Sequence, residues 1–149
     1  MSKVLIVEND RAVRDVLAYS MTKEGHEILL AENGAQALTF VDQADVVLLD
    51  LYLPKLSGED FLRMIRESGN YIPVIVTSGV YSKADVEKRL QGLSIVEFVP
   101  KPFSIVEVIE KVAKGLETSK NMSVIPRSTD RIQGFIARQA AASSSKAKA

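Results

Sequence analysis

The chain has 149 residues, 46% of them hydrophobic, which is enough to bury one ordinary core and leaves little for a second. Its 19 basic and 19 acidic residues balance, but six Lys or Arg and one acid lie beyond Thr118, so that tail carries +5 and the remainder −5. An acidic body disfavours nucleic-acid binding by the globular part. The absence of cysteine excludes disulfides, thiolate catalysis and Cys-ligated metal sites, and a single histidine, His26, excludes a His-rich metal site.

The N-terminal segment MSKVLIVEND enters an apolar run at once and reaches an acid by Glu8, unlike a signal peptide. No apolar run has the length that a transmembrane helix needs. We therefore expect a soluble, cytoplasmic protein with no membrane partner.

Apolar runs alternate with helical patterns along the first 118 residues. Continuous apolar or β-branched segments predict strands at residues 4–7, 26–31, 46–49, 72–77 and 95–99. Apolar residues at helical spacing predict helices from residue 11 to about 25, from 33–34 onward, and after the capping residues Ser57, Ser82 and Ser104. Five strands alternating with five helices predict an α/β domain, with a parallel sheet covered by helices on both faces.

The composition changes after Thr118. Residues 119–149 are basic and polar and are expected to form a linker and tail, so the predicted domain spans residues 1–118. Thr129 could cap a short helix at 129–140 with Ile132, Phe135 and Ile136 on one side, whereas the low-complexity end is expected to be disordered.

Polar side chains follow four of the predicted strands. They are Glu8, Asn9, Asp10, Asp50, Thr77, Ser78 and Lys101. The carboxyl ends of parallel strands lie at one edge of a sheet, so these residues should form one acidic pocket that contains one ammonium group. Magnesium suits such oxygen ligands, and a carboxylate beside a divalent ion and a lysine can attack phosphorus. Asp50, at the end of the buried run 46–49, is the best-placed nucleophile.

The four segments VLIVEND, VVLLDLYLPKLSG, VIVTSG and FVPKPF occur in this order, each at a predicted strand end. On these segments the chain resembles the receiver domain of two-component response regulators, over roughly residues 3–117. The resemblance implies a five-stranded parallel sheet in the flavodoxin-like order 2-1-3-4-5. It also implies a phosphoprotein of a phosphorelay rather than a classical enzyme.

The resemblance assigns roles to individual residues. Asp50 would be the phospho-acceptor, Thr77 the switch hydroxyl, Lys101 the phosphate-contacting lysine and Phe98 the aromatic switch. The peptide bond from Lys101 to Pro102 would be cis.

The resemblance also implies a magnesium site. Glu8, Asp50 and the backbone carbonyl of Tyr52 would hold the ion. The second acid of the family's acidic pair is Asn9 here, which offers an amide oxygen but no charge, so magnesium affinity should fall. Asp10 could compensate, but it also suits the N-cap of the first helix.

Two functions stay open from the sequence. The first is a phosphorylation-dependent switch that accepts a phosphoryl group on Asp50 from a sensor histidine kinase or phosphotransfer protein and acts on an unknown downstream protein. The second is a degenerate receiver in which Asn9 has cost magnesium binding and phosphorylation, leaving a constitutive protein-binding module. An aspartyl-phosphate phosphatase is disfavoured, because Tyr52 stands where such an enzyme needs a second acid.

The tail is too short for a DNA-binding domain. We therefore expect a stand-alone receiver without such a domain, with a dimer through the fourth helix, fifth strand and fifth helix as a further option. Neither the kinase nor the downstream protein can be named from the sequence.

Overall fold

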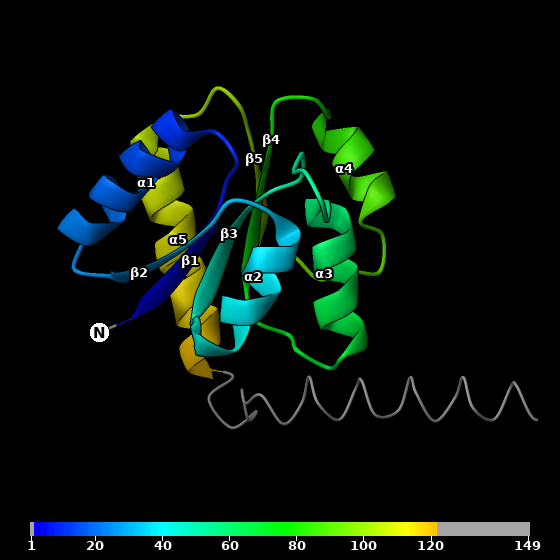
Figure 1. The fold of residues 1–149 in the computed structure, drawn as a ribbon, viewed down its shortest axis with the longest axis horizontal. Coiled ribbons are helices and arrows are strands. Elements are labelled where there is room, and N and C mark those ends of the chain that lie inside the picture. The colour runs from blue at the N-terminus through cyan, green and yellow to red at the C-terminus, as the bar shows by residue number, and fades with distance from the viewer. Residues whose placement is uncertain (1, 122–149) are drawn as a thin grey trace, which may run out of the picture.

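A computed structural model describes residues 2–121 of the chain (Figure 1). The strands are β1 (Lys3–Val7), β2 (Glu27–Ala31), β3 (Val46–Asp50), β4 (Val74–Ser78) and β5 (Glu97–Pro100). The helices are α1 (Arg11–Lys23), α2 (Gly34–Phe40), the 3-10 turn η1 (Val41–Gln43), α3 (Gly58–Glu67), α4 (Lys83–Arg89) and α5 (Ile105–Asn121). The helix expected at 129–140 lies outside the described residues. None of the helices within residues 2–121 is long and apolar enough to span a membrane.

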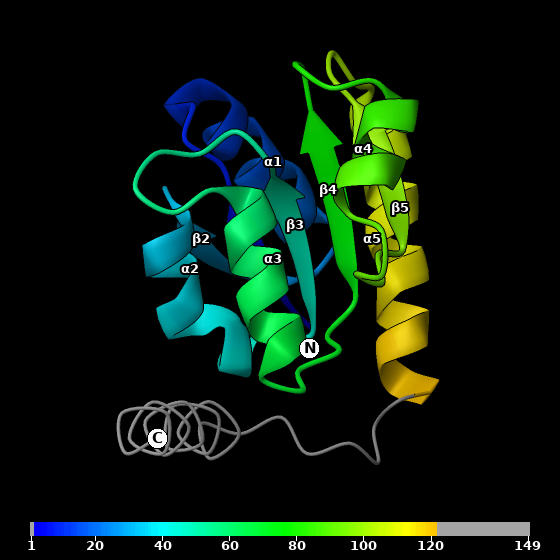
Figure 2. The same cartoon turned by 90° about the vertical axis from the view of Figure 1, so that its right-hand side faces the viewer.

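The five strands form one parallel sheet in the order β2-β1-β3-β4-β5, which confirms the predicted fold and strand order. Figure 2 shows β3 and β4 running in the same direction, so their carboxyl ends lie at the same edge. The register aligns Asp50, the last residue of β3, with Thr77 of β4. The topology therefore places two of the predicted site residues on neighbouring strands.

The three central strands, β1, β3 and β4, are buried on both faces, which explains why the sequence shows continuous apolar runs there instead of alternation, whereas the outer strands β2 and β5 are partly exposed. Val4 and Ile6 of β1 face the core under α1 and α5, whereas Leu5 and Val7 face the core under α2, α3 and α4. The two layers of helices lie on opposite sides of the sheet in Figure 1. A fully buried Val, Leu or Ile contributes about 1.5–3 kcal/mol, so both faces hold the strand ends in place.

Helices begin close behind the strands because polar side chains cap them. The Asp10 carboxylate accepts a hydrogen bond from the Val13 N–H at the start of α1, and the Ser82 hydroxyl and Asp85 form a reciprocal capping box at α4. Each cap ends a loop that begins at the carboxyl edge of the sheet. The caps therefore fix the loops around the candidate site.

Several element boundaries differ from the sequence prediction, mostly by one or two residues. β4 begins at Val74, because Pro73 has no N–H for a ladder and the Ile72 N–H donates instead to the Asn70 side chain, 2.9 Å away. β5 begins at residue 97, two residues later than predicted. α5 continues to residue 121, three residues beyond the expected domain end at 118.

Candidate functional site

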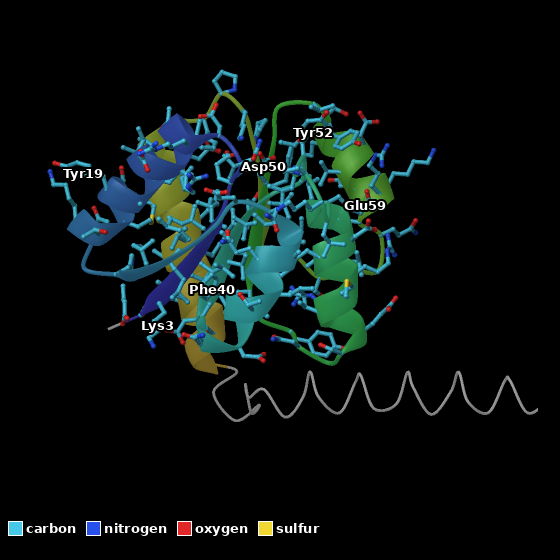
Figure 3. The ribbon with its side chains drawn as sticks, in the orientation of Figure 1. Lys3, Tyr19, Phe40, Asp50, Tyr52 and Glu59 are labelled. Carbon is cyan, nitrogen blue, oxygen red and sulfur yellow. The ribbon has the colours of Figure 1, made fainter. Side chains whose placement is uncertain are left out.

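Three charged side chains from separate strand ends meet at the carboxyl edge of the sheet. The Lys101 Nζ lies 2.5 Å from Glu8 Oε1 and 3.0 Å from Asp50 Oδ2. Only 3% of Glu8 and 7% of Asp50 is exposed to solvent. Figure 3 shows Asp50 at this edge, between the loops that follow the strands. The structure thus brings the predicted acceptor, acid and lysine into direct contact.

The backbone on both sides of the cluster is fixed. The peptide bond between Lys101 and Pro102 is cis, as expected, and the Lys101 N–H donates to the Ser78 carbonyl, 2.9 Å away. The Glu8 N–H donates to the Ala31 carbonyl at 3.0 Å. Neighbouring strands therefore hold the lysine and the glutamate at the same edge.

The cluster carries two carboxylates and one ammonium group. Burial, together with the nearby charge of Asp50, raises the pKa of Glu8, although the hydrogen bond from Lys101 lowers it. Burial lowers the pKa of Lys101, but the hydrogen bonds and charges of Glu8 and Asp50 outweigh it and the net effect raises that pKa. Lys101 consequently stays protonated, and the cluster favours additional positive charge.

The loop after β3 holds the Asp50 carboxylate in one orientation. Asp50 Oδ1 accepts a hydrogen bond from the Tyr52 N–H at 3.1 Å, while Oδ2 contacts the lysine. Gly58 returns the chain to the same place: its N–H donates to the Leu51 carbonyl, and a Cβ at this position would lie 2.3 Å from the Asp50 carbonyl oxygen. Tyr52, whose N–H donates to Asp50 Oδ1, is 72% exposed at the rim of the site.

The predicted switch residues lie on β4 and β5. Thr77 is 3% exposed and its backbone carbonyl accepts from the Leu51 N–H, which joins β4 to the loop after Asp50. The next residue, Ser78, accepts hydrogen bonds from the Val80 and Tyr81 N–H groups at 3.1 Å each. A change at Thr77 would therefore reach both the loop after Asp50 and the loop after β4 directly.

The predicted aromatic switch, Phe98, is half-buried on β5. It packs against the edge of the core under α2, α3 and α4, and its backbone is in register with Val76 of β4. The structure thus places Phe98 two strands away from β3, on the strand that pairs with β4, which carries Thr77.

Asn9 and Asp10 are exposed beside the cluster. The Asp10 carboxylate caps α1, and its backbone N–H donates to Glu8 Oε2 at 3.2 Å. Among the hydrogen bonds of residues 2–121, none joins the side chain of Asn9 or Asp10 to Asp50. These two residues are therefore near the cluster in sequence but are not bonded to the acceptor.

The oxygen atoms of the cluster fit magnesium by chemistry. Within residues 2–121 no group of three or more His, Cys, Asp or Glu side chains is arranged as a metal site. Magnesium, however, is commonly bound through one or two carboxylates and several waters. Glu8 and Asp50 supply two buried carboxylates that share one lysine, and a divalent cation would relieve their repulsion.

Sequence reasoning missed Arg14. Its side chain is buried and donates to the backbone carbonyls of Glu8, at 2.9 Å, and Asn9, at 3.4 Å. Arg14 occupies the same buried stripe of α1 as Leu17 and Met21. A charged residue on an apolar helical stripe is the signal that could have identified it as the support of the turn after β1.

Comparison with known proteins agrees with this geometry. A family model described as the response regulator receiver domain matches residues 4–113. The transcriptional regulatory protein YcbL of Bacillus subtilis is 36% identical over 122 residues, which cover 80% of this chain and 53% of that protein. Response regulator MprA of Mycolicibacterium vanbaalenii is 32% identical over 114 residues, which cover 74% of this chain and 48% of MprA.

Solved structures show the same architecture. The receiver domain of the Francisella response regulator 1452 superposes with a TM-score of 0.74 at 26% identity, covering 80% of this chain and 99% of that domain. A CheY-like receiver domain protein from Methanospirillum hungatei gives a TM-score of 0.74 at 20% identity, covering 82% and 98%, and supports the fold alone.

The partners expected from the sequence must be corrected. The expectation of a stand-alone receiver without a DNA-binding domain is contradicted, because the chain matches part of longer relatives, among them the transcriptional regulatory protein YcbL. The chain spans about half the length of those relatives. A receiver core buries its own residues in the same way whatever it is joined to, so its sequence pattern does not reveal the domains found beside it in related proteins.

Proposed function

The chain belongs to the response regulator receiver domain family, and from that premise we propose that it is a signalling switch controlled by phosphorylation of Asp50. The observation that carries the proposal is the double contact of Lys101 with Glu8 and Asp50. It places a cation at the carboxylate that would be phosphorylated. We assign this function to the unit that begins with β1 and ends with α5.

The donor would be a phosphohistidine of a sensor kinase or phosphotransfer protein. An Asp50 carboxylate oxygen attacks phosphorus, the new O–P bond forms as the P–N bond breaks, and the electron pair stays on the imidazole nitrogen, which takes up a proton. The Tyr52 N–H and the Lys101 ammonium orient the two carboxylate oxygens before attack. Lys101 then turns from the carboxylate to a phosphoryl oxygen, where its charge is a strong hydrogen-bond donor.

Phosphorylation would shift the population between two conformers. Thr77 is aligned with Asp50, so its hydroxyl can bond a phosphoryl oxygen, and the loop that Ser78 anchors would follow it. Phe98, half-buried at the edge of the core, can exchange its position as that loop moves. The phosphoryl group favours the conformer in which it makes the most contacts, which changes the surface offered to partners.

Magnesium would be held by Glu8, Asp50, the Tyr52 carbonyl and the amide oxygen of Asn9, with Asp10 kept as the cap of α1. When bound, the ion neutralises charge on the phosphoryl oxygens. Asn9 makes this ligand set less negative than an acidic pair would be. The presence of Asn9 in place of an acid is the reason why a degenerate, unphosphorylated receiver stays the second candidate.

Incubation with phosphoramidate separates the two candidates. The full chain with millimolar magnesium should gain the mass of one phosphoryl group, Asp50→Asn should gain none, and Asn9→Asp should be labelled at lower magnesium concentration than the wild type. Labelling of Asp50→Asn would refute the acceptor assignment. A wild type that stays unlabelled while Asn9→Asp is labelled would favour the degenerate receiver.

A further inference from the structure

A cavity of about 380 Å³ lies at the edge of the sheet opposite to Asp50. It is half open to solvent and is lined by the C-terminal part of α3, the start of β4, the residues that precede β5 and the later turns of α5. Much of its lining is apolar, including Pro73, Val74 and Val96. The volume is that of a small-molecule site.

A buried cation, the guanidinium of Arg66, lines one side of the cavity. Arg66 of α3 is 8% exposed and donates through Nε and Nη2 to the Ser94 carbonyl, at 3.2 and 2.7 Å, and through Nη1 to the Asn70 carbonyl at 2.9 Å. A guanidinium has five N–H groups, so each terminal nitrogen keeps one beyond these bonds. The guanidinium is therefore held in one orientation by three hydrogen bonds, and two of its N–H groups are left for a ligand.

Within the described part of the chain, this charge has no carboxylate partner. Within residues 2–121, Arg66 takes part in no ion pair, and its Cζ lies 5.9 Å from the centre of the Tyr71 ring. Burial lowers the pKa of Arg66 to about 10, which still leaves it charged at neutral pH. A buried unpaired charge is costly, and an anion beside it would recover part of that cost.

A second cation lies at the rim. Lys114 of α5 lines the same cavity and is largely exposed, with its Nζ 3.3 Å from Glu97. Glu97 also pairs with Lys111, at 3.7 Å, so it does not depend on Lys114 alone. The cavity thus combines an apolar body with a buried guanidinium inside and an ammonium at its mouth.

We propose that this cavity binds a small organic carboxylate with an apolar or aromatic body. The carboxylate would pair with the remaining N–H groups of Arg66, whose planar fork matches carboxylate geometry. The apolar body would lie on Pro73, Val74 and Val96. A bare inorganic anion is disfavoured, because it would lose its hydration against this lining without gaining apolar contacts.

Titration of the 15N-labelled full chain with naphthalene-2-carboxylate tests the proposal. Saturable shifts are expected at the backbone amides of Tyr71, Ser94 and Val96. The matched neutral probe, naphthalene-2-carboxamide, has the same apolar body and should bind about tenfold more weakly or worse. Equal affinity for the two probes, or shifts centred on the separate apolar groove at Val13 and Phe103, would overturn the proposal.

Variants locate the charge that matters. Arg66→Met should reduce naphthalene-2-carboxylate affinity to that of the carboxamide, whereas Arg63→Met, the same change on the exposed side of α3, should leave it unchanged. Lys114→Gln, at an exposed position, should weaken the carboxylate by roughly twofold to fivefold and leave the carboxamide unaffected. If Arg66→Met does not fold, the carboxylate–carboxamide comparison and Lys114→Gln still decide. Unchanged carboxylate binding in a folded Arg66→Met would refute the site.

Discussion

Gly58 allows the first turn of α3 to approach the acceptor strand. In Gly58→Ala the added Cβ would lie 2.3 Å from the Asp50 carbonyl oxygen and 2.7 Å from the Leu51 Cα. The first distance is about 1.1 Å shorter than the 3.4 Å at which ordinary contact begins, and both neighbours are backbone atoms. Overpacking of this kind costs about 1–3 kcal/mol, which outweighs the gain of about 1 kcal/mol that alanine brings to a helix.

The movement needed to relieve this clash falls on the acceptor. A displacement of about 1 Å at a reacting group can cost up to about a hundredfold in rate, so Gly58→Ala should be labelled by phosphoramidate about tenfold to a hundredfold more slowly. The control is Gly79→Ala, whose Cβ would lie 3.4 Å from the Lys101 side chain and needs no movement. Urea unfolding and intact-mass labelling measure the two effects. Wild-type stability and labelling rate in Gly58→Ala would refute the close-approach argument.

Three further substitutions test the charge of Lys101, the support that Arg14 gives to the turn after β1, and the role of Tyr52 at the rim of the site. Lys101→Met in EDTA should destabilise the fold by about 1–3 kcal/mol at about pH 7. The pKa of Glu8 is already raised in the native state, and loss of the lysine would raise it further, so the native variant takes up a proton at a higher pH than the unfolded chain does. The loss of unfolding free energy should therefore be smaller at about pH 5 than at about pH 7. An equal loss at both pH values in urea unfolding would contradict this. Arg14→Met removes the donor to the buried Glu8 carbonyl and should lower the free energy of unfolding in urea by about 1–3 kcal/mol. The control, Arg11→Met at an exposed ion pair, should change it by less than about 0.5 kcal/mol. Equal losses in the two variants would argue against a role of Arg14 in supporting the turn after β1. Tyr52→Asn should shorten the lifetime of the phosphorylated form by roughly threefold or more, because a smaller side chain at the rim admits water, and an unchanged lifetime by mass spectrometry would remove that role.

The sheet and its polar edge could be predicted because their causes are local. The doubly buried strands appear as continuous apolar runs, and the residues that follow them need only a parallel arrangement to converge. The starts of β4 and β5 were predicted too early, since β-branched residues such as Ile72 favour a strand although the hydrogen bonds go elsewhere.

Other features depend on contacts between distant segments. Arg14 and Arg66 read as ordinary helical charges until the structure shows the carbonyls that they bind. Asp10 suited both a metal ligand and a cap, and the structure shows the cap bond to Val13. The link of a relative such as YcbL to transcription leaves no trace in the packing of a receiver core, so the sequence pattern alone did not predict it.

The central claim is that Asp50 carries the phosphoryl group. Borohydride reduction of the phosphoramidate-treated full chain converts an aspartyl phosphate into homoserine, which tandem mass spectrometry of the resulting peptides can locate. We predict homoserine at position 50 and at no other acidic residue. Homoserine elsewhere with an unmodified Asp50 would contradict the account.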